Sequence, residues 1–388
     1  MGRQRLWTAE FIAMGVSSFF QYMAQYVLLA TLPLFIMESL HGGDFEAGLA
    51  MTFFQVGTVC CRPFAGKWID SYNKQKLLLG ATGVFLALML LFNFISSLPL
   101  ILALRLVHGA VFAMGTTAAA ALATLVLLDE RKGDGIGYFA VFSNFAMVLG
   151  PFLGLLLLGF SPRLLFAFLA IIAGVTFWVS NRSQLPPEIV LPVKKKKQGH
   201  SLADFIEKQA VPTALLGGMV FFSYAGVITF IPLYLKTLGL ETMTSMFFAA
   251  FALVIVLTRP LVGRAFDRIG AGSVIYPGFA LFAAGLVVLG SSSSSGGMFA
   301  AAAVLGAGFG ALSPAFQTIA IQSSPAVRAG VATATYFWSL DIFVGLGALG
   351  LSLISLQVGY QRMYMISAMV VLLAAIFYLV GFGRGGKK

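Results

Sequence analysis

The chain has 388 residues, of which 59% are hydrophobic and 10% are charged, and its formal net charge is +11. A soluble domain carries roughly 25% charged residues, so this composition excludes a water-soluble globular protein and indicates that lipid surrounds most of the chain. The two cysteines, Cys60 and Cys61, are adjacent, and this spacing predicts neither a disulfide framework nor a metal site.

Long apolar runs predict an all-α membrane protein with twelve transmembrane helices, because each crossing needs about 20 mainly apolar residues. A closed barrel would instead show alternating segments of about ten residues. The first run follows Arg3 and Arg5, but it is too long for a signal peptide and no small-residue cleavage site follows it. The expected helices are 9–34, 46–66, 76–96, 98–125, 136–159, 162–180, 210–235, 243–263, 272–291, 298–321, 330–355 and 360–382.

The positions of the positive charges predict the orientation. If the N-terminus is cytoplasmic, most of the 25 Lys and Arg residues lie at the cytoplasmic face. The exceptions are Arg163, Lys236 and Arg362 outside, and Arg105 within a helix. Lys and Arg accumulate on the cytoplasmic side of membrane proteins, so we expect both termini there, in a multi-pass protein of the cell membrane, which we expect to be a bacterial inner membrane. The basic charge then reflects topology and anionic lipid headgroups, and it requires no nucleic acid.

The chain reads as a duplicated unit. The run Arg-Pro-x-x-Gly-(Lys or Arg)-x-x-Asp occurs at 62–70 and again at 259–267, after an apolar run each time. A polar stretch, 181–209, separates a six-helix half at 1–180 from a second at 210–388, and we interpret it as a cytoplasmic linker. Two parallel halves of this kind hold their substrate between them near the middle of the membrane.

The doubled signature resembles the major facilitator superfamily, whose loop after the second helix reads roughly Gly-x-Leu-Ala-Asp-Arg-x-Gly-Arg-Lys. The resemblance extends over essentially the whole chain, and it implies that Asp70 and nearby basic residues latch the halves on the cytoplasmic side. The alternative is that Asp70 only shapes a tight loop. The matching residues are Gly66, Asp70 and Lys74 in the first copy and Gly263, Asp267, Arg268 and Gly270 in the second, while Ser71, Asn73 and Gln75 depart from the family pattern.

The segment 98–125 carries Arg105-Leu106-Val107-His108-Gly109, which resembles the family's Arg-x-x-Gln-Gly motif associated with proton coupling. An arginine in lipid is costly and normally has a role or a partner, so Arg105 is a candidate for coupling or substrate contact, against a purely structural pair. His108 stands where the family has Gln, and a histidine side chain can titrate near neutral pH, so it is a second candidate for coupling; a packing role is the alternative.

The segment 136–159 resembles the Gly- and Pro-rich motif of proton-coupled exporters in the family. A Gly-Pro pair permits a kink and close helix packing, so we interpret it as a hinge, and simple helix packing is the alternative. The residues that carry the resemblance are Gly137, Gly150, Pro151 and Gly154, while Ala146 and Leu155 replace two glycines of the motif.

Polar residues in the apolar segments are candidates for the substrate-binding surface. Those in 9–34 share one face, which we expect to point away from lipid because unpaired polar groups are costly there. Interhelical hydrogen bonds are the alternative role for each. They are Glu10, Ser17, Ser18, Gln21 and Gln25 with Tyr22 at the edge, and elsewhere Asn144, Tyr224, Ser313, Gln317, Tyr336, Trp338 and Asp341.

Asp341 is the most informative acid. It lies about eleven residues into the segment 330–355, near the middle of the membrane at roughly 1.5 Å per residue. A carboxylate there either pairs with a cation or carries a proton, so Asp341 is a candidate proton carrier or counter-charge. Glu10 is the second candidate, unless it is merely interfacial.

These observations predict a proton-coupled antiporter that exports a small amphipathic or zwitterionic organic molecule, such as a drug-like compound or a metallophore, by alternating access. A proton symporter for a sugar or organic acid and a lipid flippase of the same fold are the alternatives. An enzyme is disfavoured because no nucleophile, base or metal-ligand set is clustered. We expect no cofactor and no metal. The expected partners are the substrate, protons and membrane lipids, and we expect a monomer.

Overall fold

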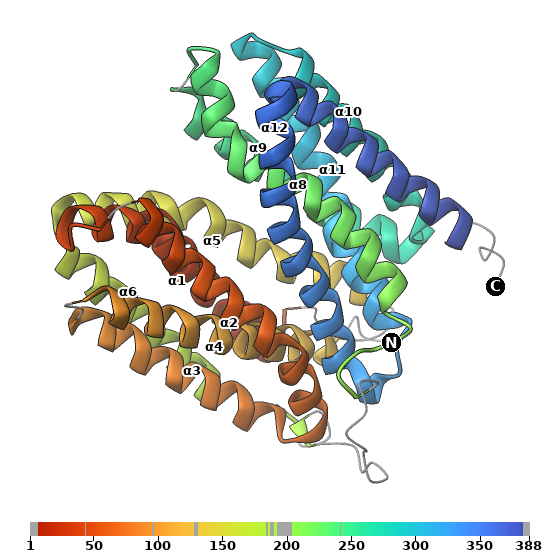
Figure 1. Cartoon of the computed structure of the whole chain (residues 1–388). Coiled ribbons are helices and arrows are strands. Elements are labelled where there is room, and N and C mark those ends of the chain that lie inside the picture. The colour runs from red at the N-terminus through yellow and green to blue at the C-terminus, as the bar shows by residue number, and fades with distance from the viewer. Residues whose placement is uncertain are drawn as a thin grey trace. The chain divides into compact units, whose positions relative to one another are not determined.

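The computed structural model describes residues 7–42, 44–94, 97–127, 131–183, 185–186, 190–191, 204–240 and 242–382. Within these ranges all regular secondary structure is helical, which confirms the all-α prediction (Figure 1). The helices of the first half of the sequence are α1 (Ala9–Ser39), α2 (Asp44–Ser71), α3 (Lys74–Leu91), η1 (Phe92–Phe94), α4 (Leu98–Val126), α5 (Lys132–Phe160) and α6 (Pro162–Arg182). Those of the second half are α8 (Val211–Thr237), α9 (Met243–Ile269), α10 (Gly272–Ser291), α11 (Ser295–Gln322), η4 (Ala326–Arg328) and α12 (Ala329–Phe382).

Ten helical stretches in the described part of the chain are long and apolar enough to cross a membrane, so the protein is a multi-pass membrane protein. The helix α2 is not among the ten, and it carries Gln55, Arg62 and Lys67 along its length. The last stretch, Ala326–Gly381, has 56 residues. At 1.5 Å per residue this is far longer than the roughly 30 Å of a hydrocarbon core.

The helix α12 folds back on itself at Gly359. Its φ of 79° and ψ of 168° are non-helical, and this left-handed conformation suits glycine because it has no Cβ. Residues on both sides of the break approach the same place on α8. A Cβ built on Gly226 would lie 2.8 Å from Leu351 Cδ1 and 3.8 Å from Ser367 Oγ. The break lies where the sequence predicts a boundary between 330–355 and 360–382.

The chain forms two compact units. The first consists of Met1–Asp129, Phe142–Lys208 and Ser324–Trp338, and the second of Glu130–Val141, Gln209–Ser323 and Ser339–Lys388. Each unit therefore includes the start of one helix that continues in the other unit: α12 begins in the first unit and α5 begins in the second. These two helix starts, Lys132 and Ala329, are 197 residues apart, which is the spacing of the doubled signature.

The core of the first unit lies between α1, α3, α4 and α6 and is built largely from aromatic and aliphatic side chains. The rings of Phe35 and Phe166 meet edge to face with centroids 5.0 Å apart, and Phe92 stacks on Phe166 at 6.0 Å. Offset and edge-to-face pairs are the favoured arrangements of aromatic rings. This packing fixes the helices that carry the polar residues described below.

Glycines let α2 and α4 approach until their backbones touch. A Cβ on Gly57 would lie 2.0 Å from the carbonyl oxygen of Leu106, and one on Gly109 would lie 2.0 Å from that of Phe54. The second unit repeats the contact, because a Cβ on Gly306 in α11 would lie 2.6 Å from the carbonyl oxygen of Phe251 in α9. Small residues at helix crossings are how membrane helices gain close van der Waals packing.

Gly109→Ala is expected to lower the thermal unfolding temperature of the detergent-solubilised protein, because its methyl group has no space against the backbone of α2. Overpacking of this kind typically costs about 1–3 kcal/mol. Gly80→Ala is the matched control, since a Cβ on Gly80 in α3 meets nothing within 4 Å. That change should leave the unfolding temperature unchanged or slightly raised, because Ala favours helix over Gly. Equal unfolding temperatures for the two variants would contradict this account of the α2–α4 contact.

Candidate functional site

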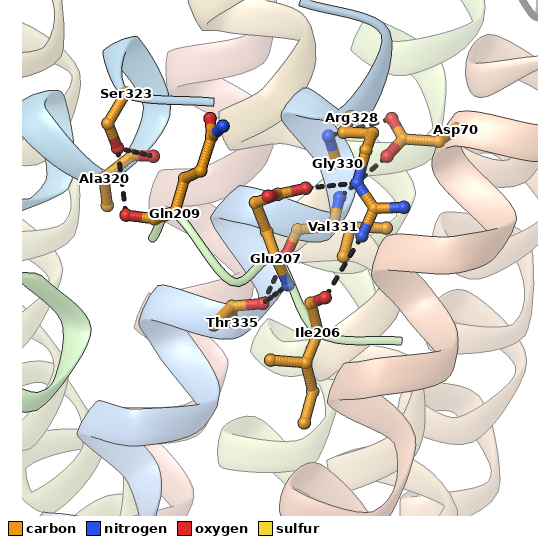
Figure 2. A network of polar contacts seen from close by, with 10 residues as sticks. All are labelled: Asp70, Ile206, Glu207, Gln209, Ala320, Ser323, Arg328, Gly330, Val331 and Thr335. Atoms are coloured by element: carbon orange, nitrogen blue, oxygen red, sulfur yellow. Dashed lines mark hydrogen bonds and ion pairs between the residues drawn. The ribbon is translucent and has the colours of Figure 1, made fainter. Parts of the chain in front are cut away.

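The carboxylate of Asp70, at the end of α2, caps the first turn of α12. Its Oδ1 accepts from the backbone N–H of Gly330 and its Oδ2 from that of Val331, both at 2.9 Å (Figure 2). Asp70 is 3% exposed, so these charge-assisted bonds are shielded from water. The negative charge also lies at the positive end of the α12 dipole, where it is stabilising. We call this contact the first latch, and all of its residues belong to the first unit.

Asp267, the equivalent residue of the second signature, caps α5 in the same way. Its Oδ2 accepts from the backbone N–H of Asp134 at 2.7 Å, within the second unit. Asp267 follows Asp70 by 197 residues, and Val331 follows Asp134 by the same number. The two carboxylates therefore bind equivalent amides of equivalent helices. This is the second latch, and Arg131 adds an ion pair to the Asp134 carboxylate at 2.8 Å.

The glycines of the signature set how closely the latched helices approach. A Cβ on Gly66 would lie 2.5 Å from Ala334 Cβ and 2.9 Å from the carbonyl oxygen of Gly330. In the second latch, a Cβ on Gly137 in α5 would lie 3.4 Å from the carbonyl oxygen of Arg259 and 3.9 Å from the Cα of Gly263. Of the basic residues of the motif, Lys74 is buried and its Nζ donates to the carbonyl oxygen of Leu191 at 3.5 Å, whereas Arg268 is exposed.

Arg105 is fully buried in α4, and the acceptors that surround it are neutral. Its Nε donates to the carbonyl oxygen of Ala50 at 3.2 Å. Its Nη1 donates to Gln25 Oε1 and to His108 Nδ1, both at 3.2 Å. Because a guanidinium has no acceptor, His108 Nδ1 must be the acceptor, and the neutral imidazole then carries its proton on Nε2. That nitrogen is buried with no hydrogen-bond partner among the described residues. The sequence-predicted pair and Gln25 thus form one cluster, the Arg105 cluster.

An aromatic frame encloses this cluster, and the second unit repeats the frame without the charge. Phe54 and Phe85 lie 5.1 and 5.7 Å from the His108 ring, and Phe54 also lies 4.3 Å beneath the guanidinium of Arg105. Phe112 packs against Phe54 in the same frame. The residues 197 positions after these three are Phe251, Phe282 and Phe309: Phe251 and Phe309 stack on Tyr224, with the Phe309 ring centroid at 4.1 Å, and Phe282 packs against Phe309. The Arg105 and His108 positions correspond to Ala302 and Leu305. Among the described residues, the second frame thus has apolar side chains where the first has Arg105 and His108.

Gly150 and Gly154 in α5 bring that helix against α1. A Cβ on Gly150 would lie 2.7 Å from Tyr26 Cβ, and one on Gly154 would lie 3.0 Å from Thr31 Cγ2 and 3.2 Å from Val27 Cγ1. Pro151 lies between them inside the helix. The equivalent contact in the second unit joins α8 and α12, where a Cβ on Gly347 would lie 2.5 Å from the carbonyl oxygen of Phe222. The motif residues are thus at a tight helix crossing.

The polar face of α1 points into the protein, as its pattern predicts, and most of it contacts other helices. Ser17 Oγ lies 3.1 Å from Ser180 Oγ in α6. Gln21 is buried against Gly115 of α4 and donates to the carbonyl oxygen of Ser17 at 3.2 Å, while Tyr22 meets Phe112 edge to face at 5.0 Å. Glu10 is part-buried in the first turn of α1, next to the capping residue Thr8.

The remaining candidates lie in separate places. Gln317 in α11 and Trp338 in α12 each keep a buried side-chain N–H without a hydrogen-bond partner among the described residues. Tyr336 is buried beside Phe337, whereas Asp341 is half-buried and lies in the part of α12 that belongs to the second unit, which begins at Ser339. Asn144 lies in α5, but its side chain is outside the described part of the structure.

The contacts made by the end of the linker are not predicted by the sequence pattern. Asp204, Phe205 and Glu207 contact α2 and the start of α12, as Figure 2 shows for Glu207. A short acidic and apolar stretch directly before α8 was the available signal, but its partners lie more than a hundred residues away in sequence.

Comparison with known proteins decides the family. The model of the Major Facilitator Superfamily matches residues 14–348 and again residues 241–386. The chain belongs to the major facilitator superfamily. Members of this superfamily are transporters rather than enzymes, so the protein is a membrane transporter of a small-molecule substrate.

Relatives within the superfamily match over nearly their whole length. The uncharacterized MFS-type transporter YhhS of Escherichia coli (strain K12) is 27% identical over 94% of this chain and 90% of its own. The human organic anion transporter MFSD10 (TETRAN) shares the fold with a TM-score of 0.79 at 13% identity, over 95% of this chain and 98% of that one. A bacterial homologue of the iron transporter ferroportin, solved in an outward-facing state, has a TM-score of 0.76 at 15% identity, over 96% and 99% of the two chains.

Proposed function

We propose that this transporter is a proton-coupled antiporter that exports a small amphipathic or zwitterionic organic molecule by alternating access. The proposal includes twelve membrane crossings in two six-helix halves, 1–180 and 210–388, joined by a cytoplasmic linker at 181–209. It places both termini on the cytoplasmic side of a bacterial inner membrane, in a monomer surrounded by lipid.

The observation that carries the proposal is the Arg105 cluster. A buried charge within a membrane helix is costly and marks a functional position. Here the first aromatic frame holds an arginine where the second holds Ala302, and no carboxylate pairs with Arg105 among the described residues. An anionic group on the substrate would supply the missing counter-charge. This favours zwitterionic or anionic molecules over purely cationic drugs within the proposed class.

Two further groups complete the proposed mechanism. Asp341 is proposed as the proton carrier, with Glu10 as a second acid. The polar and aromatic residues Gln21, Tyr22, Gln25, Asn144, Tyr224, Gln317, Tyr336 and Trp338 are proposed to line the substrate path. Protonation and substrate binding would then compete, and each would bias the populations of the inward- and outward-facing states. The latches and the Gly150–Gly154 crossing are the contacts that such a cycle would break and remake.

The test uses the full-length protein in proteoliposomes that contain a pH-sensitive dye. A proton gradient is imposed and three compound classes are added: cationic drugs, sugars, and metal-chelating amino-acid conjugates. We expect proton movement opposite to the substrate, with the amino-acid conjugates, and loss of this movement in Asp341→Asn, because an amide cannot carry the proton. Substrate binding should persist in that variant. Proton movement in the same direction as the substrate would establish a symporter and overturn the export proposal. Normal coupling in Asp341→Asn would remove that residue from the mechanism.

A further inference from the structure

Residues 204–207, at the end of the linker, contact the end of α2 that carries the signature 62–70. The Nζ of Lys67 lies 3.7 Å from Asp204 Oδ2 and 4.3 Å from the centre of the Phe205 ring. Phe205 also meets Phe64 edge to face, with ring centroids 5.2 Å apart. One lysine of the signature thus makes both an ion pair and a cation–π contact with the linker.

Two of these four residues, Ile206 and Glu207, contact the end of η4 and the start of α12. The Nε of Arg328 pairs with Glu207 Oε2, and its Nη2 donates to the carbonyl oxygen of Ile206 at 3.1 Å. The backbone N–H of Glu207 donates to Thr335 Oγ1 at 3.0 Å. Figure 2 shows this chain segment passing between Arg328 and Thr335, beside the first latch. Residues 204–207 therefore join α2 to α12, and we call them the linker strap.

These contacts are shielded enough to matter energetically. The side chain of Glu207 is 8% exposed, and those of Lys67 and Asp204 are each 15% exposed. An exposed ion pair contributes little to stability, whereas a buried charge-assisted hydrogen bond contributes more. A buried carboxylate is also costly to leave without a hydrogen-bond partner. All of the contacting residues belong to the first unit.

The strap holds α12 on either side of the first latch. Asp70 binds the amides of Gly330 and Val331, whereas the strap binds Arg328 before them and Thr335 after them. The linker occurs once in the chain, so the second latch cannot have an equivalent strap made from it. The start of α12 is thus attached to the first unit by two kinds of contact, while α12 itself continues into the second unit after Trp338.

We infer that the linker strap is a conformational lock, which holds the start of α12 on α2 and must release before these two helix ends can separate. Alternating access in parallel-repeat transporters moves one half relative to the other. A helix shared by the two units transmits that movement. Release of the strap therefore adds to the free-energy barrier that breaking the Asp70 contacts supplies. The linker must then itself move during the transport cycle.

The test measures amide hydrogen exchange by mass spectrometry on the full-length protein in lipid nanodiscs. The variants are Glu207→Gln, Arg328→Gln and Thr335→Val, with the exchanged-charge double variant Glu207→Arg/Arg328→Glu. The control is Lys76→Gln, an exposed cation in the first turn of α3. Hydrogen exchange reports local opening of a segment directly, and no substrate is needed. The outcome is therefore independent of whether the protein is an antiporter.

We expect each single variant to speed exchange in 204–208 and 329–335 by about tenfold, the effect of losing one charge-assisted hydrogen bond or its equivalent. Exchange in α4 should not change, and Lys76→Gln should match the unaltered protein. The exchanged-charge variant should restore slow exchange. Unchanged exchange in Glu207→Gln and Arg328→Gln would overturn the lock. So would a rise that the exchanged charges do not reverse, or an equal rise in Lys76→Gln.

Discussion

Asp70→Ala is expected to slow transport about 10- to 100-fold while the protein reaches the membrane at its normal level, because two charge-assisted hydrogen bonds to the first turn of α12 are lost. Transport is measured in proteoliposomes with any substrate that the antiport assay identifies. The loss of these bonds shifts the populations of the inward- and outward-facing states. The substrate affinity of each state should therefore change less than the transport rate.

Two matched changes show whether the latch itself is responsible. Gly330→Ala should reproduce the loss, because its Cβ would lie 2.8 Å from Asp70 Oδ1 and displace the carboxylate. Gly345→Ala is the control in the same helix, since a Cβ there meets nothing within 4 Å. Glu38→Gln removes an exposed carboxylate from α1 and should have no effect. Wild-type transport by Asp70→Ala would show that Asp70 only shapes the end of α2.

Arg105→Gln is expected to reduce transport by at least about 100-fold, since removing a buried charge leaves its hydrogen-bond acceptors unpaired at a cost of about 1–3 kcal/mol each. The acceptors are the carbonyl oxygen of Ala50, Gln25 Oε1 and His108 Nδ1. Arg105→Lys keeps the charge but cannot reach all three, because an ammonium lacks the planar fork of the guanidinium. It should therefore recover only part of the activity.

The readouts for Arg105 separate a functional role from a structural one. Arg163→Gln removes an exposed arginine near the start of α6 and serves as the control for the charge change. If Arg105 binds the anionic part of the substrate, Arg105→Gln should weaken substrate binding at least as much as its lower thermal unfolding temperature would predict. Arg105→Lys should still bind the substrate, but more weakly than the unaltered protein. Equal binding by Arg105→Gln and the unaltered protein would refute the counter-charge role.

The positions of the latches followed from the sequence, but their partners did not. A signature repeated after 197 residues predicts that Asp70 and Asp267 are equivalent, because duplicated chains fold alike. Nothing in the local pattern indicates that Asp70 binds amides 260 residues further along. Such partners depend on how helices pack, and periodicity gives only the face that each helix buries.

The sequence pattern also predicts only part of the candidate site, because it gives the face of a helix and not the partners of that face. The spacing of Arg105 and His108 places them on one face of α4, one turn apart, and the structure brings Gln25 of α1 to the same place. The polar face of α1 points inward, as the pattern predicts, and there Ser17 contacts α6 and Gln21 contacts α4. Hydrogen bonds between helices and contacts with substrate require the same residue types, so composition cannot separate them.

The tight crossings of α5 with α1 and of α12 with α8 bear on how the two halves diverged. In the first unit Gly154 faces Val27, whereas in the second Leu351 faces Gly226. Leu351 follows Gly154 by 197 residues, and Gly226 follows Val27 by 199, which is the spacing between the Leu-Pro-Leu segment of α1 and the Ile-Pro-Leu segment of α8. The small residue has moved from one helix to the other while the pair keeps similar combined volume, as close packing demands. At this crossing the two halves thus keep the combined volume of the contacting pair, although the residues themselves differ. A single residue copied from one half to the other would leave either a clash or a void, so the halves can drift only by coupled steps.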